Sequence, residues 1–593
     1  MGKKPLVSTK HILLASVLYT PLSYAYRPFP PFKPPGNVQR FIRDQAAAVV
    51  LGKAFFWDMQ AGSDGIVACA SCHHHGFSDH RLNGQLHPGA NGRIDTTLDQ
   101  YLLTPESFPF PKDNDDAVGS QGVIRAEFRD IVLGQAEELF TTIADPLFTN
   151  GWKNLRQVTK VHAPTVISAA LNHRNFWDGR AQQIFNGVTP FGPHDPAAHS
   201  QLWHSNEASQ KVETIDIALE PASAASQAVG PAIDPVEMSY HGRTWPKLAK
   251  KLLNLRPLGK QLVHNEDSVL ASLSSYPEKG LSRSYSDLIE QAFCREWWDS
   301  PQQFVFAKEQ RIIPADPLLT SSLEPREVFS LMEVNFSLLW GLAIQAYEST
   351  LLADASPFDH FRQGKSDSSF DATVQQGFAL FTGKAQCSSC HREVLLAAAT
   401  HENIDLLGVS ISRLTVDGTS AFLDTGFFNI GLRPSQENLG IGGKTPFGTP
   451  LSVAKISHPA ERLAIDGAFK APGLRNVALR GPYFHNGSRA DLDQVLDFYQ
   501  NHGPFYQANA ENININLSRV EIADEDKGPL KAFLTRGLTD QRVAMESAPF
   551  DHPSLRLANG LMLDDEEAFI ELPAIGAGGR SLEGLGPLLA IFE

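Results

Sequence analysis

The chain has no excess of basic residues and no long apolar segment, and it contains few cysteines. Lysine and arginine number 51 against 66 aspartates and glutamates, so the net charge is −15. A nucleic-acid-binding protein needs a basic face, and this balance argues against that class. Only five cysteines occur in 593 residues, so each needs its own explanation. A chain of this length is expected to build at least two hydrophobic cores.

The apolar run near the N-terminus is too short to cross a bilayer comfortably. Three lysines lie within the first ten residues, the run covers Ile12 to Tyr19, and small residues follow at Ser23 to Ala25. This order is typical of a secretory signal peptide over residues 1–25. We therefore expect an exported, periplasmic protein with no membrane span after cleavage. An uncleaved anchor is the alternative.

Four of the five cysteines belong to two identical motifs of the form C-x-x-C-H. The motifs contribute Cys69, Cys72 and His73, and Cys387, Cys390 and His391. In such a motif the two thiols bond to one haem and the histidine binds its iron. The sequence therefore predicts two covalently bound haem c groups, with His73 and His391 as iron ligands. The fifth cysteine, Cys294, lies among aromatic residues and is expected to be buried.

The rest of the sequence predicts mostly helices separated by loop-rich segments, with little sustained β alternation. Helices are expected over residues 38–58, 326–353 and 371–381, and after a capping box at Ser488–Asp491 that is followed by one apolar face of Leu492, Val495, Leu496 and Tyr499. Stretches near 81–160 and 182–222 are expected to be loop-rich insertions. No internal repeat is evident beyond the two haem motifs.

The order of several short motifs resembles the bacterial di-haem cytochrome c peroxidase and MauG family. The matching pieces are Leu51-Gly52-Lys53, both C-x-x-C-H motifs, Ala163-Pro164-Thr165, Phe176 to Ala181, Gln227 to Glu237, Ser356 to Asp359, Leu474 to Leu479 and Pro482 to His485. The resemblance implies a mostly α fold with two cytochrome-c-like haem domains and long loop-rich insertions. It implies an N-terminal domain over 26–335, a C-terminal domain over 336–535 and a tail over 536–593.

The resemblance also implies roles for four residues. Gln227 and Glu237 correspond to a pair over the first haem, with Glu237 as the acid and base of peroxide cleavage and Gln227 as its positioning partner. Trp177 corresponds to a tryptophan between the two haems. Tyr499 stands where the peroxidases carry methionine and MauG carries tyrosine, and it is expected to be the second iron's sixth ligand. Without the resemblance, Glu237 is equally well a surface carboxylate, and Trp177 and Tyr499 are core aromatics.

Two features depart from the family pattern. The resemblance implies an interdomain calcium with main-chain donors near Arg480 and Pro482, but His162 replaces the usual asparagine, and imidazole is a poor calcium ligand. Calcium therefore stays an open alternative that is not favoured. No histidine corresponds convincingly to the distal haem ligand of resting peroxidases. Gly89 falls close to the spacing expected for that ligand, and His87 is only near it. The histidines at 74, 75 and 80 are expected to face solvent as readily as the first haem.

These observations predict a peroxidase that reduces hydrogen peroxide to water with electrons from a redox protein such as cytochrome c. The first haem would react with peroxide and the second would transfer electrons. One alternative is a MauG-like oxidase that uses peroxide to modify residues of a partner protein. Another is a non-catalytic di-haem electron carrier. An oxygenase acting on an apolar polymer is more remote, and the presence of Glu237 argues against it.

Overall fold

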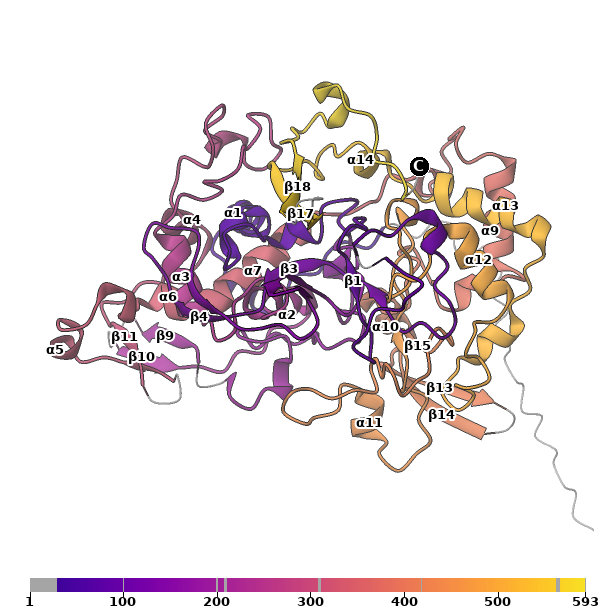
Figure 1. The fold of residues 1–593 in the computed structure, drawn as a ribbon, viewed down its shortest axis with the longest axis horizontal. Helices are drawn as coiled ribbons and strands as arrows, with labels where there is room; N and C mark the ends of the chain where they lie inside the picture. Colours follow the sequence, from indigo (N-terminus) through magenta and orange to yellow (C-terminus); the bar gives the residue numbers. More distant parts are fainter. Residues whose placement is uncertain are drawn as a thin grey trace, which may run out of the picture.

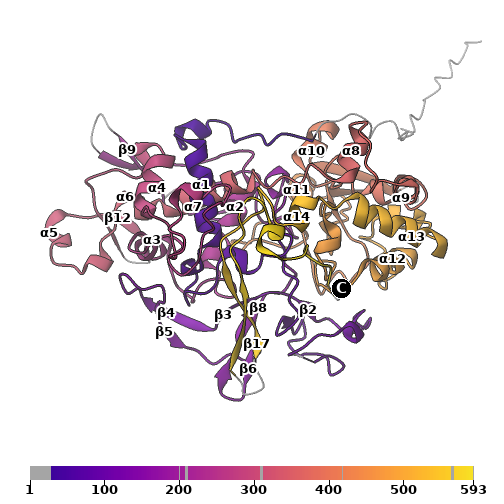
Figure 2. The ribbon, with the colours of Figure 1, turned by 90° about the horizontal axis from the view of Figure 1, so that it is seen from above.

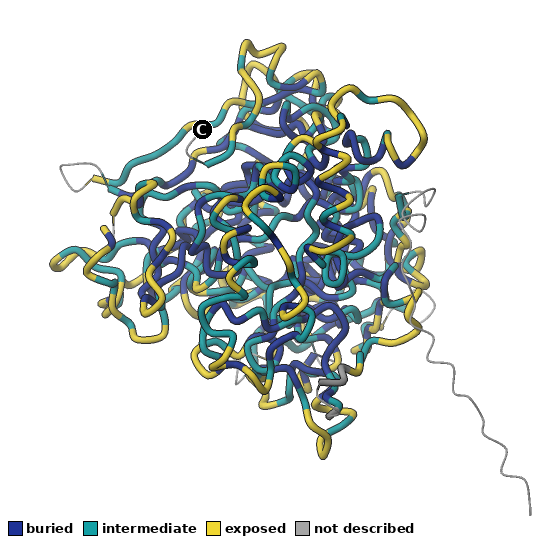
Figure 3. Tube along the Cα trace, turned by 90° about the vertical axis from the view of Figure 1, so that its right-hand side faces the viewer, coloured by how far each residue is buried: buried dark blue, intermediate teal, exposed yellow. Residues whose placement is uncertain are grey.

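The computed structural model describes residues 29–99, 101–198, 201–206, 211–307, 311–416, 419–561 and 566–591. The predicted signal peptide at residues 1–25 lies outside these ranges. Within them, no helix is both long enough and apolar enough to cross a membrane. Buried chain fills the interior, and exposed chain is concentrated in the outer loops (Figure 3).

The helices fall into two groups, and these two groups lie side by side (Figure 1). Their bounds are α1 Gln45–Trp57, α2 Ser223–Ala228, α3 Trp245–Leu253, α4 Tyr285–Ala292, α5 Pro317–Thr320, α6 Leu331–Val334, α7 Phe336–Glu348, α8 Pro357–Arg362, α9 Ala372–Thr382, α10 His401–Leu407, α11 Val453–Ser457, α12 Leu492–Gln500, α13 Asp524–Ala532 and α14 Gln541–Ala544. We call the group built on α1 and α7 the first half, and the group built on α9, α12 and α13 the second half.

The first half is centred on the contact between α1 and α7. The predicted helix over 38–58 is present as α1, which begins only after Asp44, whose carboxylate accepts a hydrogen bond from the Ala47 amide at 3.0 Å. The predicted helix over 326–353 is present as α6 and α7, interrupted at Asn335. A Cβ at position 52 would lie 1.9 Å from the carbonyl oxygen of Ala343, so α1 and α7 touch because residue 52 is glycine.

The second half has a separate apolar core between α9, α12 and α13. The predicted helix over 371–381 is present as α9. The helix after residue 491 is present as α12, but the predicted capping box from Ser488 is wrong. The carboxylate of Asp491 caps this helix itself by accepting a hydrogen bond from the Gln494 amide at 2.8 Å.

Strands occur only as two-stranded antiparallel pairs in the described residues. The pairs are β1 Leu86–His87 with β2 Ala117–Val118, β3 Gln121–Ile124 with β8 Arg156–Val158, β4 Ala126–Asp130 with β5 Leu139–Thr142, β6 Thr149–Asn150 with β7 Lys153–Asn154, β9 Trp203–Asn206 with β10 Lys211–Thr214, β11 Phe304–Phe306 with β12 Ile312–Pro314, β13 Ile411–Val416 with β14 Thr419–Asp424, β15 Phe427–Phe428 with β16 Phe469–Lys470, and β17 Leu555–Leu561 with β18 Glu567–Leu572. The segment 81–160 contains short strand pairs that the sequence did not predict, and they are joined by the loops that it did predict. A mostly α fold describes the two cores but not their surroundings.

The segment after residue 536 returns to the first half, so the predicted tail is an integral part of the fold. Its β17 lies beside β3 and β8 (Figure 2), and the Gly560 amide donates to Gln121 Oε1 at 3.2 Å. The Lys53 ammonium of α1 bonds Asp551 at 3.1 Å and Asp267 at 2.8 Å, with all three side chains fully buried. This ion triad fixes the C-terminal segment against α1.

Candidate haem sites

The first C-x-x-C-H motif forms a tight 3-10 turn, Cys69–Ser71, directly before His73. The Nδ1 atom of His73 lies 3.3 Å from the carbonyl oxygen of Phe77. A carbonyl only accepts hydrogen bonds, so Nδ1 carries the proton and the lone pair of Nε2 is left for a metal. Burial lowers the pKa of His73 to about 4, and the carbonyls of Phe77 and Pro164 oppose this shift. The imidazole is therefore neutral, as an iron ligand must be.

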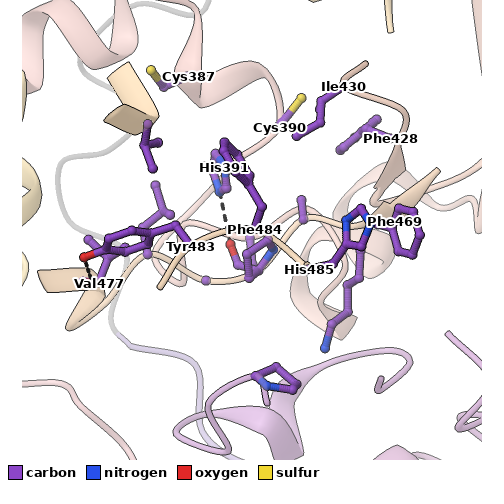
Figure 4. A pocket seen from close by; sticks show the side chains of 18 of the residues that line it. Cys387, Cys390, His391, Phe428, Ile430, Phe469, Val477, Tyr483, Phe484 and His485 are labelled. Atoms are coloured by element: carbon purple, nitrogen blue, oxygen red, sulfur yellow. Dashed lines mark hydrogen bonds between the residues drawn. The ribbon is translucent and has the colours of Figure 1, made fainter. Parts of the chain in front are cut away.

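The second motif has the same arrangement in the other half. His391 follows the turn Cys387–Ser389, and its Nδ1 lies 3.0 Å from the carbonyl oxygen of Pro472 and 3.2 Å from that of Leu396. Burial lowers the pKa of His391 to about 4. Figure 4 shows this ring held from below by the carbonyl, with Cys387 and Cys390 on its other side. Both motifs thus present two thiols and one oriented, neutral imidazole.

A cavity of about 240 Å³ opens at the second motif. Its wall includes the two thiols, His391 and the predicted apolar helix face of Leu492, Val495, Leu496 and Tyr499. The shared face predicted for this helix is therefore confirmed by the structure. Two thiols, an imidazole and an apolar wall are the surroundings that a covalently attached porphyrin needs, so the residues fit haem c.

The phenol of Tyr499 belongs to this cavity wall. No hydrogen bond to its hydroxyl is found within the described part of the chain. Burial raises the pKa of Tyr499 well above its usual value, and the Cys390 and Cys387 thiols raise it further, which places the hydroxyl near both. A phenol in such a site is protonated unless a cation binds it. Tyr499 and His391 therefore line the same cavity.

Glu237 lies at the first motif. Its negative charge contributes to the raised pKa values of both the Cys69 and Cys72 thiols. Burial, and to a smaller extent the charge of Asp234, raise the pKa of Glu237 to about 7, and Arg180 opposes this shift. The carboxyl is therefore close to half ionised at neutral pH. A surface carboxylate, the plainer interpretation of the sequence, would keep its ordinary value.

Gln227 reaches the same region from the end of α2. A Cβ at Gly230 would lie 3.4 Å from the Gln227 carbonyl oxygen and 3.3 Å from the Phe176 ring. The guanidinium of Arg180 stacks on that ring, 3.8 Å from its centroid. Arg180 therefore links the segment of Gln227 to the carboxylate of Glu237. The structure thus brings Glu237 to the first motif and Gln227 to the segment beside Phe176, and no hydrogen bond of the Gln227 side chain is found in the described residues.

Trp177 lies at the junction of the two halves. Its Nε1 donates to the carbonyl oxygen of His162 at 2.8 Å, and its own carbonyl accepts from the Lys470 amide at 2.8 Å. The indole lines the cavity of the second motif, while the adjacent Phe176 carries Arg180 near the first. This position is compatible with a bridge between two haems.

The histidine run after the first motif is largely buried, so of the two alternatives left open for it the solvent-facing one is wrong. His74 and His75 are 3% and 7% exposed, and the His75 ring stacks on His80 at 3.8 Å. The bond between His75 Nε2 and the Leu589 carbonyl, 2.8 Å long, shows the cause. The C-terminal segment covers the run. The described residues hold no group of three or more histidine, cysteine or acidic side chains arranged to bind a metal.

His162 also takes a structural role. Its Nε2 lies 2.7 Å from the Asp79 carbonyl oxygen, so it donates a hydrogen bond and offers no lone pair at that atom. Cys294 is only partly buried, and its thiol lies 3.5 Å from the Gln39 carbonyl oxygen. The expectation of a buried Cys294 is therefore met only in part.

The two halves share a longer repeat than the sequence analysis found. Ala163-Pro164 precedes Trp177, and Ala471-Pro472 precedes His485, by the same 14 positions. The backbones agree as well, because φ is positive at Ser168 and Asn476, at Phe176 and Phe484, and at Gly179 and Gly487. The expectation of no repeat beyond the haem motifs is wrong. The sequence carries further matches at the same offset, because Ala170-Leu171 corresponds to Ala478-Leu479 and Phe176 to Phe484, and these matches could have revealed the repeat.

This repeat has a chemical role and a structural one. The carbonyls of Pro164 and Pro472 face the Nδ1 atoms of the two motif histidines. The copies also exchange backbone hydrogen bonds, from the His162 amide to the His485 carbonyl at 2.9 Å and from the Lys470 amide to the Trp177 carbonyl at 2.8 Å. The halves therefore meet about a local pseudo-twofold axis.

Comparisons with known proteins agree with this site. The model of the di-haem cytochrome c peroxidase family matches residues 46–293, which contain the first motif, Trp177, Gln227 and Glu237. The predicted resemblance to the di-haem cytochrome c peroxidase and MauG family is thereby confirmed for this part of the chain.

Individual relatives support the same class. The methylamine utilization protein MauG of Methylorubrum extorquens is 29% identical over 192 residues, covering 32% of this chain and 42% of MauG. Cytochrome-c peroxidase IdrP1 of Denitromonas iodatirespirans is 29% identical over 200 residues, covering 32% of this chain and 47% of the peroxidase. The chain thus spans less than half the length of either relative.

A solved structure was also found. A MauG-like protein associated with microbial copper homeostasis superposes on 88% of this chain and 97% of its own, with 18% sequence identity and a TM-score of 0.41.

Proposed function

We propose that the protein is a di-haem c-type peroxidase that reduces hydrogen peroxide to water with electrons from a small redox protein such as cytochrome c. The observation that carries the proposal is Glu237, a carboxyl group at the first motif with a pKa near 7. Proton transfer at neutral pH needs a group with such a value, and the negative charge of Glu237 acts on both thiols of the first motif. The family match over residues 46–293 supports the same conclusion.

We propose that the protein forms two cytochrome-c-like domains, each holding one haem c. Cys69, Cys72 and His73 would hold the first group, and Cys387, Cys390, His391 and Tyr499 the second. When bound, haem c supplies an iron that binds peroxide where an axial position is open and transfers electrons where both are filled. His73 would be the protein ligand at the first motif, and His391 and Tyr499 would be the two ligands at the second.

The chain's own contribution at the first motif is proton transfer. Peroxide, two electrons and two protons yield two water molecules, and the O–O bond breaks. Glu237 in its ionised form accepts the proton of one peroxide oxygen and returns it to the departing oxygen as water leaves. Gln227 positions the peroxide through its side-chain amide. Arg180 limits the rise in the pKa of Glu237, so that both protonation forms are populated.

Electrons would pass between the two motifs at the junction. Trp177 supports this role because its indole lines the second cavity while its loop continues to Arg180 at the first motif. Hydrogen bonds at both its ring nitrogen and its carbonyl hold it in place. Export to the periplasm, where haem c is attached, agrees with this function. Calcium at the junction stays unfavoured, because Nε2 of His162 already donates to a carbonyl.

Tyr499 favours a second candidate function. A phenolate is a hard, anionic ligand that lowers the iron potential relative to methionine, which disfavours electron entry from a high-potential cytochrome. A MauG-like oxidase that modifies residues of a partner protein would use such a site. A non-catalytic electron carrier is the third alternative, and it gives no role to the shifted carboxyl of Glu237.

One set of measurements separates the three functions. The purified holoprotein is mixed with hydrogen peroxide and reduced cytochrome c, and cytochrome oxidation is followed by absorbance. We expect rapid oxidation, lost on Glu237→Gln and retained on Glu290→Gln, which changes an exposed glutamate of α4. Peroxide consumption without cytochrome oxidation would favour the MauG-like function. No reaction with peroxide in the holoprotein would leave the electron carrier.

A further inference from the structure

The cavity at the second motif contains cations but no anions. None of its lining residues is aspartate or glutamate. Its lining includes Arg475, whose guanidinium forms a bidentate ion pair with the carboxylate of Asp359, with N–O distances of 2.6 and 2.7 Å. Asp359 itself does not line the cavity. Two further cations in the wall, Lys470 and Arg480, have no salt-bridge partner in the described chain. Among the described residues, only the charge of Asp178 acts on Lys470 from a distance, and burial of a cation without an ion-pair partner is costly, so the cavity is suited to an anion.

The polar contacts of these two cations are weak substitutes for a carboxylate. The Lys470 ammonium is 3.3 Å from Asn175 Oδ1, and the residue is only 6% exposed. Arg480 Nη2 donates to the Gly473 carbonyl at 2.7 Å, while its Nε has no partner. Burial lowers the pKa of Lys470 to about 8 and that of Arg480 to about 10. Asp178 opposes the shift in the pKa of Lys470 only in part, and an anion inside the cavity would oppose the shifts of both cations.

His485 adds an unpaired nitrogen to the same wall. The residue is 5% exposed, and its Nε2 has no hydrogen-bond partner in the described structure. Its ring stacks on Phe469 at 3.6 Å, which fixes its orientation, and lies 6.2 Å from the ring of Trp177. In Figure 4, His485 and the cysteines lie on different sides of His391.

A haem c attached through two thioethers carries two carboxylates at the opposite edge of the porphyrin. The two thiols, Lys470, Arg480 and His485 line the same cavity, and the side chains of Lys470 and Arg480 approach residues of the first half. We propose that these three residues form a carboxylate-binding subsite that takes the propionate side chains of the haem attached at Cys387 and Cys390. This inference rests on the proposed haem at the second motif.

The subsite would connect the cofactor to the junction. Lys470 reaches Asn175 of the first half, and a Cβ at Gly76, also in the first half, would lie 3.8 Å from Arg480 Cγ. A carboxylate held by both cations is thus fixed against both halves at once. Its negative charge then compensates two cations in the wall, and the pair of charges sets the electrostatic potential at the second iron.

The test uses the full-length holoprotein and the variants Lys470→Met, Arg480→Met and Lys470→Arg. Lys365→Met, which removes an exposed lysine, serves as the matched control. Haem is counted as the pyridine haemochrome, and folding is checked by circular dichroism. Resonance Raman spectra report the propionate bending bands, and a spectroelectrochemical titration gives the midpoint potential of the second haem.

We expect two haem c per chain in every variant, because the thioethers hold the cofactor. The propionate bands should shift in Lys470→Met and Arg480→Met, and the midpoint potential should fall because an uncompensated carboxylate stabilises ferric iron. Lys470→Arg and Lys365→Met should leave both unchanged. Two haems with unmoved bands and potential in both methionine variants would overturn the subsite alone. A holoprotein with no haem at the second motif would overturn both the subsite and the proposed function.

Discussion

The pH dependence of peroxide turnover is the most direct consequence of the raised pKa of Glu237. Glu237 accepts a proton only when ionised, and its pKa is about 7. The ionised fraction then rises from about 0.1 at pH 6 to about 0.9 at pH 8, so kcat/KM should increase about tenfold. A carboxyl with an unshifted pKa would be fully ionised across that range and would give a flat profile.

The assay follows the initial rate of reduced cytochrome c oxidation at limiting peroxide, in buffers of constant ionic strength. Glu237→Gln should reduce kcat/KM by about 10²- to 10⁴-fold, the usual contribution of general acid–base catalysis, and abolish the tenfold pH step. Glu237→Asp should keep the step at reduced rate. A flat profile in the wild-type enzyme, or an unchanged step in Glu237→Gln, would refute the role given to this carboxyl.

Three further predictions concern the framework of the sites. Lys53→Met should destabilise the protein by about 3–5 kcal/mol, because it removes the cation that pairs with two buried aspartates. Urea denaturation measures this loss against the control Lys365→Met, and equal unfolding midpoints of the two variants would contradict it. Gly52→Ala should lower the melting temperature in calorimetry, since its methyl would collide with the Ala343 carbonyl, and an unchanged transition would show that α1 and α7 can separate freely. Tyr499→Met should raise the midpoint potential of the second haem and change its ferric EPR signal, whereas a core tyrosine would leave both unchanged.

The sequence was informative where chemistry demands particular residues at fixed spacing. The C-x-x-C-H motifs located both sites, and the 3.6-residue periodicity of Leu492 to Tyr499 identified a helix face that lines the second cavity. Helix existence was predicted better than helix ends, because caps such as Asp491 depend on local hydrogen bonds that several residues could supply.

Long-range contacts could not be read from the sequence. The C-terminal segment was predicted to be a tail because its charged and loop-forming residues bind partners that are distant in sequence. Lys53, for example, lies nearly 500 positions before its partner Asp551. The buried histidines behind the first motif were misjudged for the same reason, since Leu589 covers them. Lys470, Arg480 and His485 were overlooked as a group because only the folded chain brings them to one cavity.

The exchange of backbone hydrogen bonds at the junction resembles the interface of an isologous dimer whose two subunits are joined into one polypeptide. In such a dimer, one bond and its symmetry mate form together, so neither half can complete its own histidine-orienting loop alone. Joining the halves permits what a true dimer forbids, namely different side chains at equivalent positions. Trp177 therefore faces its counterpart His485 across the axis, and the two residues are a different aromatic ring at the same position of each half.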